Sequence, residues 1–130
     1  MSEQTVVDAY AWVEYLDGSK LGEKLRDLME HGSELYTSAV TLAEVVSKAA
    51  RTGRDHKTAH RVISGNSTII EADEQLSYEA GVLHAEIRKT VKDFGLGDAY
   101  VLATARRLNA KILTGDPHFK DVKDARALHY

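Results

Sequence analysis

Residues 97–117 read GDAYVLATARRLNAKILTGDP and contain two different kinds of predicted secondary structure. The segment Ala99–Leu108 is nearly all apolar, and its small Ala103 and Ala105 would let a helix pack closely on a sheet. The KILT that follows is a short apolar run, which is typical of a buried strand. A buried helix that leads directly into a buried strand predicts an α/β fold.

The same alternation of helix and strand extends through the rest of the chain. Short apolar runs predict strands at residues 5–9, 34–38, 68–70 and 111–114, with a possible short last strand at 126–130. Helical spacing of apolar residues predicts helices at 9–16, 21–30, 41–51, 55–63, 73–94 and 99–108. Parallel strands joined by helices give a sheet that is covered on both faces. We therefore expect a three-layer α/β/α fold with a mostly parallel sheet of about five strands.

Length and composition are typical of one globular domain, which we expect to span residues 1–130. The chain has 43% hydrophobic and 28% charged residues and no internal repeat. It contains no cysteine, which excludes a disulfide framework and fits a reducing compartment. The first residues lack the features of a signal peptide, and no apolar stretch is long enough to span a bilayer. We expect a cytoplasmic protein with no membrane partner.

Net charge gives no general attraction to nucleic acid. At −3 the average field repels phosphates, so a nucleic-acid partner would need a local basic patch. Candidate basic residues lie in two stretches, one with Arg51, Arg54, Lys57 and Arg61 and the other at 106–107. Charged helix faces are usually only solvated, and contact with RNA phosphates through Arg54, Lys57 and Arg61 is the functional alternative.

Four carboxylates are placed where a parallel sheet would gather them. Asp8 ends the first predicted strand, Glu44 lies early in the helix after the second, Asp98 opens the apolar helix, and Asp116 follows the fourth strand. Ligands of open parallel sheets bind outside the carboxyl ends of the strands. The residue before a proline is disfavoured in the helical conformation, so Pro117 should hold Asp116 on an extended or turning backbone.

Each of the four carboxylates also has a purely structural interpretation. Asp8 fits a helix N-cap, and TLAE at 41–44 fits a capping box in which Glu44 reaches back to Thr41. Asp98 could complement a helix dipole, and Asp116 could be a turn residue. As a group they are harder to explain in this way, because clustered carboxylates repel one another unless a cation offsets their charge.

Oxygen ligands without cysteine favour a hard divalent cation such as Mg²⁺ or Mn²⁺. Such ions keep water molecules and bind phosphate oxygens, so the natural chemistry is hydrolysis of a phosphodiester by one or two metal ions. The residues thus predict a metal-dependent hydrolase acting on a phosphodiester.

Four segments together resemble the successive motifs of PIN-domain ribonucleases, in particular the VapC-like toxins of prokaryotic toxin–antitoxin pairs. They are VVDAYAWVEYL (6–16), TLAEVVSK (41–48), GLGDAYVLATARRL (95–108) and ILTGDPHF (112–119). The resemblance implies a small parallel-sheet fold and Mg²⁺- or Mn²⁺-dependent endoribonuclease activity. It also implies RNA as substrate, a cognate antitoxin that occludes the site, and a homodimer.

Carried onto this chain, the resemblance implies a catalytic set of carboxylates with a neighbouring hydroxyl. The catalytic residues would be Asp8, Glu44, Asp98 and Asp116, of which the three aspartates would be the metal ligands. Thr114 takes the place of a hydroxyl residue near the metal-bound water in the family. All the acidic positions are present, so nothing in the sequence indicates a degenerate enzyme.

Other residues allow weaker interpretations. His56 and His60 are one helical turn apart and could bind zinc, although a solvated helix face is the more usual explanation. Tyr10 and Trp12 could stack on a base or belong to the core. His118 lies beside Asp116 and could touch a scissile phosphate, but a loop histidine with no identified partner supports nothing stronger.

Two other classes of function remain open. A phosphotransfer protein also gathers aspartates at parallel strand ends, but the dehalogenase type needs a second aspartate two places after the nucleophile, where this chain has Tyr10. A noncatalytic module that only binds RNA or protein is the other alternative.

Overall fold

The computed structural model describes residues 3–115, 119 and 127–128. In this part of the chain one sheet of five strands has the order β3-β2-β1-β4-β5, which makes β1 its central strand. All neighbouring strands pair in parallel, as predicted. The strands are β1 (Gln4–Val7), β2 (Glu34–Ser38), β3 (Thr68–Ile70), β4 (Lys111–Leu113) and β5 (Ala127–Leu128).

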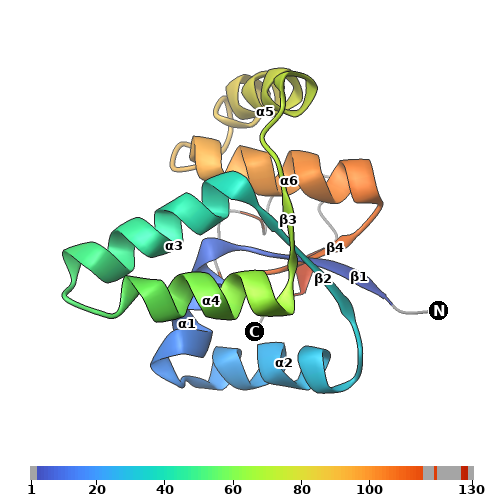
Figure 1. Ribbon diagram of the computed structural model, residues 1–130. Coiled ribbons are helices and arrows are strands. Elements are labelled where there is room, and N and C mark those ends of the chain that lie inside the picture. The colour runs from blue at the N-terminus through green and yellow to red at the C-terminus, as the bar shows by residue number, and fades with distance from the viewer. Residues whose placement is uncertain (1–2, 116–118, 120–126, 129–130) are drawn as a thin grey trace.

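Pairs of helices connect the first four strands, so each connection crosses over one face of the sheet (Figure 1). Helices α1 and α2 follow β1, α3 and α4 follow β2, and α5 and α6 follow β3. They are α1 (Ala9–Asp17), α2 (Lys20–Glu30), α3 (Ala39–Arg51), α4 (His56–Asn66), α5 (Glu74–Ile87) and α6 (Leu96–Leu108). The predicted α/β/α architecture is therefore confirmed.

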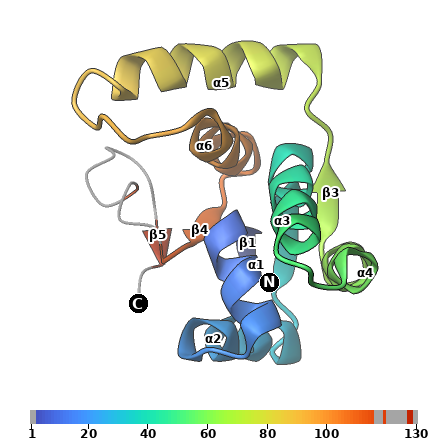
Figure 2. The ribbon, with the colours of Figure 1, turned by 90° about the vertical axis from the view of Figure 1, so that its left-hand side faces the viewer.

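Alternation along the central strands divides the core into two halves. Val6 and Ile112 contribute to a cluster with α5 and α6, whereas Val7 and Leu113 contribute to a cluster with α1 to α4. This is the two-residue period of a strand buried on both faces. Figure 2 shows α6 beside the sheet and α5 outside α6, with α1 and α2 on the opposite side.

Helix α5 is shorter than predicted. The apolar spacing predicts a helix over 73–94, but α5 ends at Ile87, and residues 88–94 turn back toward α6. Val91 and Phe94 still pack against the α6 side of the core, and the Phe94 ring meets Phe119 edge to face at 5.8 Å between centroids. Their spacing resembles a helical period, although a reversing segment presents them to the core.

Helices α3 and α6 begin earlier than predicted. They start at Ala39 and Leu96, whereas the sequence predicts starts at Thr41 and Ala99. The last strand lies within the predicted 126–130. None of the helices in the described residues is long and apolar enough to cross a membrane.

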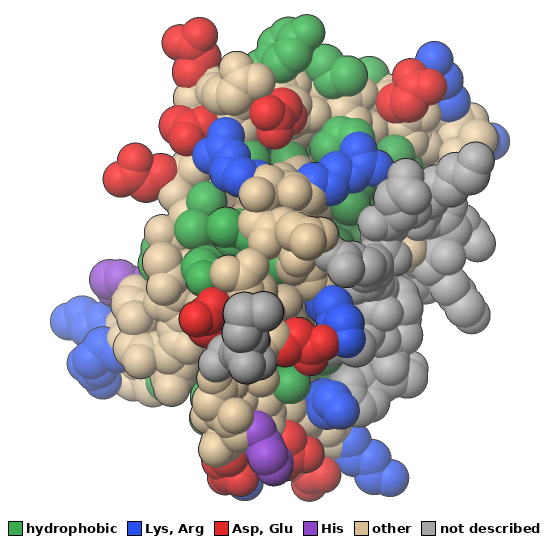
Figure 3. Space-filling view, turned by 90° about the vertical axis from the view of Figure 1, so that its right-hand side faces the viewer, with side chains coloured by type: hydrophobic (Ala, Val, Ile, Leu, Met, Phe, Trp, Pro, Cys, Tyr) green, Lys and Arg blue, Asp and Glu red, His purple; other side chains and the backbone are tan. Residues whose placement is uncertain are grey.

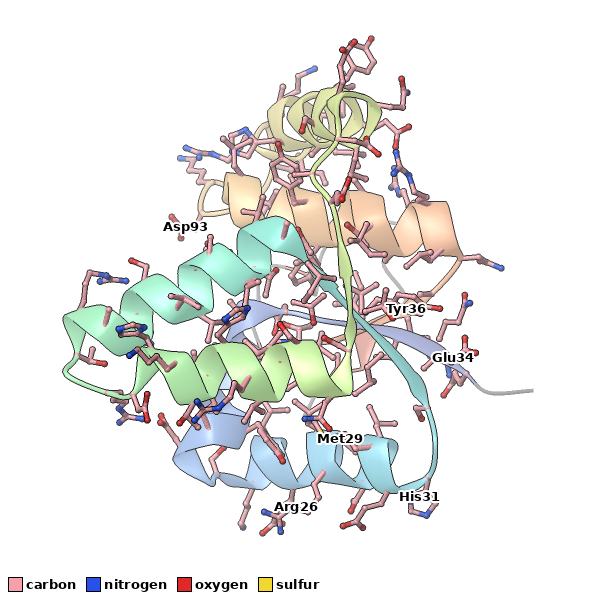
Figure 4. All side chains as sticks on the ribbon, in the orientation of Figure 1. Arg26, Met29, His31, Glu34, Tyr36 and Asp93 are labelled. Atoms are coloured by element: carbon pink, nitrogen blue, oxygen red, sulfur yellow. The ribbon has the colours of Figure 1, made fainter. Side chains whose placement is uncertain are left out.

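The amino ends of the strands lie at one end of the molecule, where acidic and basic side chains are interspersed (Figure 3). At this end Glu34 and Tyr36 lie near each other at the start of β2 (Figure 4). Gln4 donates from Nε2 to Glu34 Oε2 and to the Tyr36 hydroxyl at 3.3 and 3.4 Å. Burial and the charge of Glu34 raise the pKa of Tyr36. These contacts join β1 to β2, so the cluster has a structural role.

Candidate active site

The candidate site lies at the carboxyl ends of β1 and β4, where the chain changes direction across the sheet. From β1 the strands continue through β2 and β3 on one side and through β4 and β5 on the other. Helices that leave neighbouring strands in this way open a crevice, which is the usual ligand site of such sheets. Figure 2 faces this end of the molecule, with α1, α3 and α6 around it.

Asp8 is held at the end of β1 by two hydrogen bonds. Its backbone N–H donates to the Leu113 carbonyl of β4 at 3.2 Å, and its Oδ1 accepts from the backbone N–H of Ala11 at 2.8 Å. The side chain is only 3% exposed. Asp8 is therefore the N-cap of α1, as the structural interpretation predicts, and its carboxylate is fixed in one orientation.

Thr114 supports the same carboxylate from the neighbouring strand. It follows β4, is fully buried, and donates its hydroxyl to Asp8 Oδ2. The two carboxylate oxygens of Asp8 thus have separate donors, one from α1 and one from the end of β4. The contact makes Thr114 a partner of Asp8, while its predicted place near a metal-bound water stays a prediction.

Glu44 does not form the predicted capping box. Helix α3 is capped by Ser38, whose Oγ accepts from the backbone N–H of Val40 at 3.1 Å, so Glu44 lies in the second turn. Thr41 is buried inside the helix, and its hydroxyl has no hydrogen-bond partner among the described residues. The capping interpretation is wrong because the N-cap is Ser38, three residues before the Thr41 that TLAE suggests.

The carboxylate of Glu44 lies against the backbone of Gly97 in the first turn of α6. A Cβ at Gly97 would lie 2.5 Å from Glu44 Oε1 and 2.6 Å from Oε2. Such distances are far shorter than any ordinary contact, so a side chain at this position would require Glu44 to move. Gly97 therefore makes room for Glu44 between α3 and α6.

Asp98 is the third residue of α6 and accepts a hydrogen bond within the same turn. Its Oδ2 accepts from the backbone N–H of Gly95 at 2.9 Å. A carboxylate in this position also interacts favourably with the helix dipole. The structural interpretation of Asp98 is thus confirmed, and it is compatible with a site because the residue also lines the crevice described next.

The three carboxylates share one cleft of about 550 Å³ between α1, α3 and α6. Asp8, Glu44 and Asp98 all line it, although they are 36 or more positions apart in the sequence. The topology therefore gathers three of the four predicted acidic residues. Asp116 and His118 lie outside the described residues, so their predicted roles stay predictions.

The electrostatics of the cleft disfavour the ionised form of Glu44. Partial burial raises the pKa of this carboxyl, and the negative charge of Asp98 raises it further. A bound cation would reverse both effects by offsetting the charge. The donors are carboxylate oxygens, which suits a hard cation such as Mg²⁺ or Mn²⁺.

The described carboxylates do not form a complete protein cage for a metal. In residues 3–115, 119 and 127–128, no three His, Asp or Glu side chains are grouped closely enough to hold an ion. Mg²⁺ does not require such a cage, because it usually keeps several water molecules and binds one or two carboxylates together with substrate phosphates. The donor set fits this mode of binding, in which Asp8 and Asp98 are the described candidate ligands.

Comparison with known protein families gives a match over most of the chain. The family model of the PIN domain matches residues 5–125. The chain belongs to the PIN-domain family. A search of curated proteins finds no match.

Solved structures of similar fold cover nearly the whole PIN domain. The VapBC2 complex of Rickettsia felis bound to promoter DNA has a chain with a TM-score of 0.78 and 14% identity, over 98% of both chains. VapC20 of Mycobacterium tuberculosis, described as a sarcin–ricin loop cleaving toxin, has a TM-score of 0.75 and 16% identity, over 94% of this chain and 97% of that one. DNA-bound VapBC of Salmonella typhimurium has a TM-score of 0.73 and 16% identity, over 99% and 98%. At these identities the likeness establishes the fold.

The aromatic residues near Asp8 have different positions in this PIN domain. Trp12 is fully buried, and its indole N–H donates to Thr37 Oγ1 at 3.0 Å, so it belongs to the core and cannot stack on a base. Tyr10 is 47% exposed and lines the cleft. Of the two, only Tyr10 is available to a ligand.

Of the basic stretch singled out in the sequence, Arg51 lines the cleft, whereas Arg54, Lys57 and Arg61 do not. Arg54 forms an ion pair with Asp17 at the rim of the cleft. Lys57 and Arg61 are exposed on α4 and are not among the residues that line the cleft. The helix α4 also carries His56 and His60, which lack a third ligand among the described residues.

Four further charged residues line the cleft, and only Arg51 among them was a candidate from the sequence, as part of a basic stretch. Glu14 and Asp17 extend from α1, and Lys48 and Arg51 extend from α3. The spacing of Lys48 and Arg51 from Glu44, four and seven residues, places all three on one helix face. That spacing is visible in the sequence, and it could have identified Lys48 and Arg51 as neighbours of the acidic site.

Proposed function

We propose that this PIN domain is an endoribonuclease that hydrolyses RNA phosphodiester bonds with Mg²⁺ or Mn²⁺ at the carboxylate cleft. The observation that carries the proposal is the meeting of Asp8, Glu44 and Asp98 in one cleft, where the charge of Asp98 helps to raise the pKa of Glu44. Like charges gathered in this way favour a bound cation.

The described residues suit distinct roles in hydrolysis. A bound divalent ion would supply Lewis-acid charge and lower the pKa of a water molecule. Asp8 and Asp98 each have one oxygen fixed by a backbone N–H, which orients them as ligands. Thr114 holds the other oxygen of Asp8. Asp116 is the third ligand proposed from the sequence.

Glu44 is suited to accept a proton from the attacking water. Its carboxylate lines the same cleft as Asp8 and Asp98, and a general base has to lie within hydrogen-bond reach of the proton that it accepts. Gly97 leaves the space that this carboxylate occupies. We assign Glu44 the proton-accepting role and the aspartates the metal-binding role.

We further propose that the protein is the toxin of a toxin–antitoxin pair in the cytoplasm. Support comes from the neighbours in fold, which include VapBC complexes and an RNA-cleaving VapC toxin. A cognate antitoxin would then be the protein partner. A homodimer is implied by the family resemblance and stays a prediction.

The activity is tested by comparing the wild type with Asp98→Asn on single-stranded RNA. Asparagine keeps an oxygen that can accept from Gly95, so the first turn of α6 and the circular dichroism spectrum should be unchanged. Loss of the negative charge should remove cation binding and reduce cleavage to background. The wild type should cleave with Mg²⁺ or Mn²⁺ and not in EDTA.

Cleavage that persists in EDTA or in Asp98→Asn would contradict the metal mechanism. RNA or protein binding without any cleavage by the wild type would support the noncatalytic alternative. The same pair of proteins tests the toxin assignment, because expression without a partner should arrest growth for the wild type and not for Asp98→Asn. Equal growth at equal expression would exclude a toxin.

A further inference from the structure

Two basic residues of α3 share a cleft with the carboxylates. Lys48 and Arg51 lie four and seven residues beyond Glu44, so all three are on one face of the helix, and all three line the cleft. With a rise of about 1.5 Å per residue, Lys48 is displaced by about 6 Å from Glu44 along the helix axis and Arg51 by about 10 Å. One wall of the cleft therefore changes from negative to positive toward its outer end.

Both cations are available to a ligand. The ion pairs among the described residues involve Arg54, Lys89, Arg107 and Lys111, and none involves Lys48 or Arg51. Arg51 donates from Nε to Ser47 Oγ at 3.2 Å, which leaves the other guanidinium N–H groups for an acceptor. Both side chains are exposed.

The residues that α1 contributes to the cleft carry the opposite charge. Glu14 and Asp17 of α1 line it, and Asp17 is already paired with Arg54. A phosphate near α1 would meet carboxylates, whereas a phosphate near α3 would meet cations. The cleft thus distinguishes its two walls by charge, although the protein as a whole carries a net charge of −3.

We propose that Lys48 and Arg51 form a phosphate-binding track along which the backbone of single-stranded RNA leaves the carboxylate site. The proposal rests on the proposed function and adds the direction of the bound RNA, because the RNA strand follows α3 and avoids α1. Lys48 binds the phosphate nearer to the cleaved bond, and Arg51 binds one farther out. Lys57 and Arg61, for which RNA contact was the functional alternative to a solvated helix face, lie on α4 outside this track.

A purely structural role for the two cations predicts a different outcome. Lys48 and Arg51 are in the last turn of α3, where positive charge stabilises the helix dipole. In that case their replacement would lower helix stability and leave RNA affinity unchanged. Binding and stability therefore have to be measured on the same variants.

The test measures affinity for a short fluorescent single-stranded RNA at several salt concentrations, in an Asp98→Asn background that does not cleave it. The double substitution Lys48→Gln with Arg51→Gln should weaken binding, and the salt slope of log K should become shallower by about 0.7 for each lost phosphate contact. The matched double variant Lys57→Gln with Arg61→Gln loses the same charge and should keep the slope. Glu14→Gln on α1 should bind the RNA as tightly as the unsubstituted protein or more tightly.

The same substitutions are also made without Asp98→Asn, so that the result does not depend on binding by the inactive variant. Lys48→Gln with Arg51→Gln should raise the RNA concentration needed for half-maximal cleavage more than it lowers the maximal rate. Unchanged affinity and KM, or equal losses in both double variants, would overturn the track while wild-type cleavage still upheld the proposed function. A wild type that neither binds nor cleaves RNA would overturn both.

Discussion

The pKa of Glu44 shows how the surroundings in the folded protein change the chemistry of a single residue. On an isolated helix it would be an ordinary solvated carboxylate, but here it lies beside Gly97, close enough to Asp98 for the two charges to interact. Burial first, and then the charge of Asp98, raises its pKa above the usual 4.5. The folded protein therefore binds a proton at this position more readily than the unfolded chain does.

This shift predicts a pH-dependent difference between the wild type and Glu44→Gln without metal. Stability from the protonated carboxyl is fully present below the ordinary pKa and is lost as the pH rises through the raised value. Glutamine has no such loss. The free energy of unfolding of Glu44→Gln should therefore increase relative to the wild type as the pH rises from below the ordinary pKa of glutamate through the raised pKa of Glu44. Urea unfolding in EDTA measures the difference. If the unfolding free energies of the two proteins change in parallel with pH, the site does not raise the pKa of Glu44.

At the scale of elements, the close approach of α3 and α6 depends on Gly97. Gly97→Ala should leave the fold intact, because alanine favours a helix by up to about 1 kcal/mol over glycine and the clash is with the end of a flexible side chain. The displaced Glu44 should nevertheless lower RNA cleavage strongly. Stability and cleavage of the same preparation give the two readouts.

Gly81→Ala is the matched control for this substitution. Gly81 is also helical and exposed, on α5, and a Cβ there would meet nothing within 4 Å. It should therefore change stability to a similar small extent and leave cleavage unchanged. If Gly97→Ala cleaves as well as Gly81→Ala does, the position of Glu44 is not important for the reaction.

The elements also show what the sequence could and could not predict. The spacing of apolar residues predicted the order and type of every described helix and of the first four strands, because burial against the core determines that spacing. It did not give helix ends that depend on tertiary contacts, such as the end of α5 at Ile87. The capping box at Thr41 was wrong for a related reason, since Ser38 at the end of β2 competes for the same role and is closer to the start of the helix.

For the whole molecule, the parallel topology explains why distant residues could be assigned to one site. Strand order places the ends of β1 and β4 side by side, so Asp8 and Thr114 meet although they are 106 positions apart in the sequence. The spacing of Lys48 and Arg51 from Glu44 could have identified them as cleft residues, but only because Glu44 marks the face of α3 that borders the cleft. Residue types alone do not contain that information.

The central claim is that the carboxylate cleft binds a divalent cation, and thermal unfolding with and without Mn²⁺ tests it most directly. A ligand that binds only the folded state adds about 2.7 kcal/mol at a hundredfold excess over its Kd, which corresponds to a Tm increase of several degrees. The wild type should show this increase. Asp98→Asn and Asp116→Asn should have an unchanged or slightly higher Tm in EDTA and should lose most of the gain with Mn²⁺. A wild type whose Tm does not respond to Mn²⁺, or variants that gain as much as the wild type, would contradict the claim.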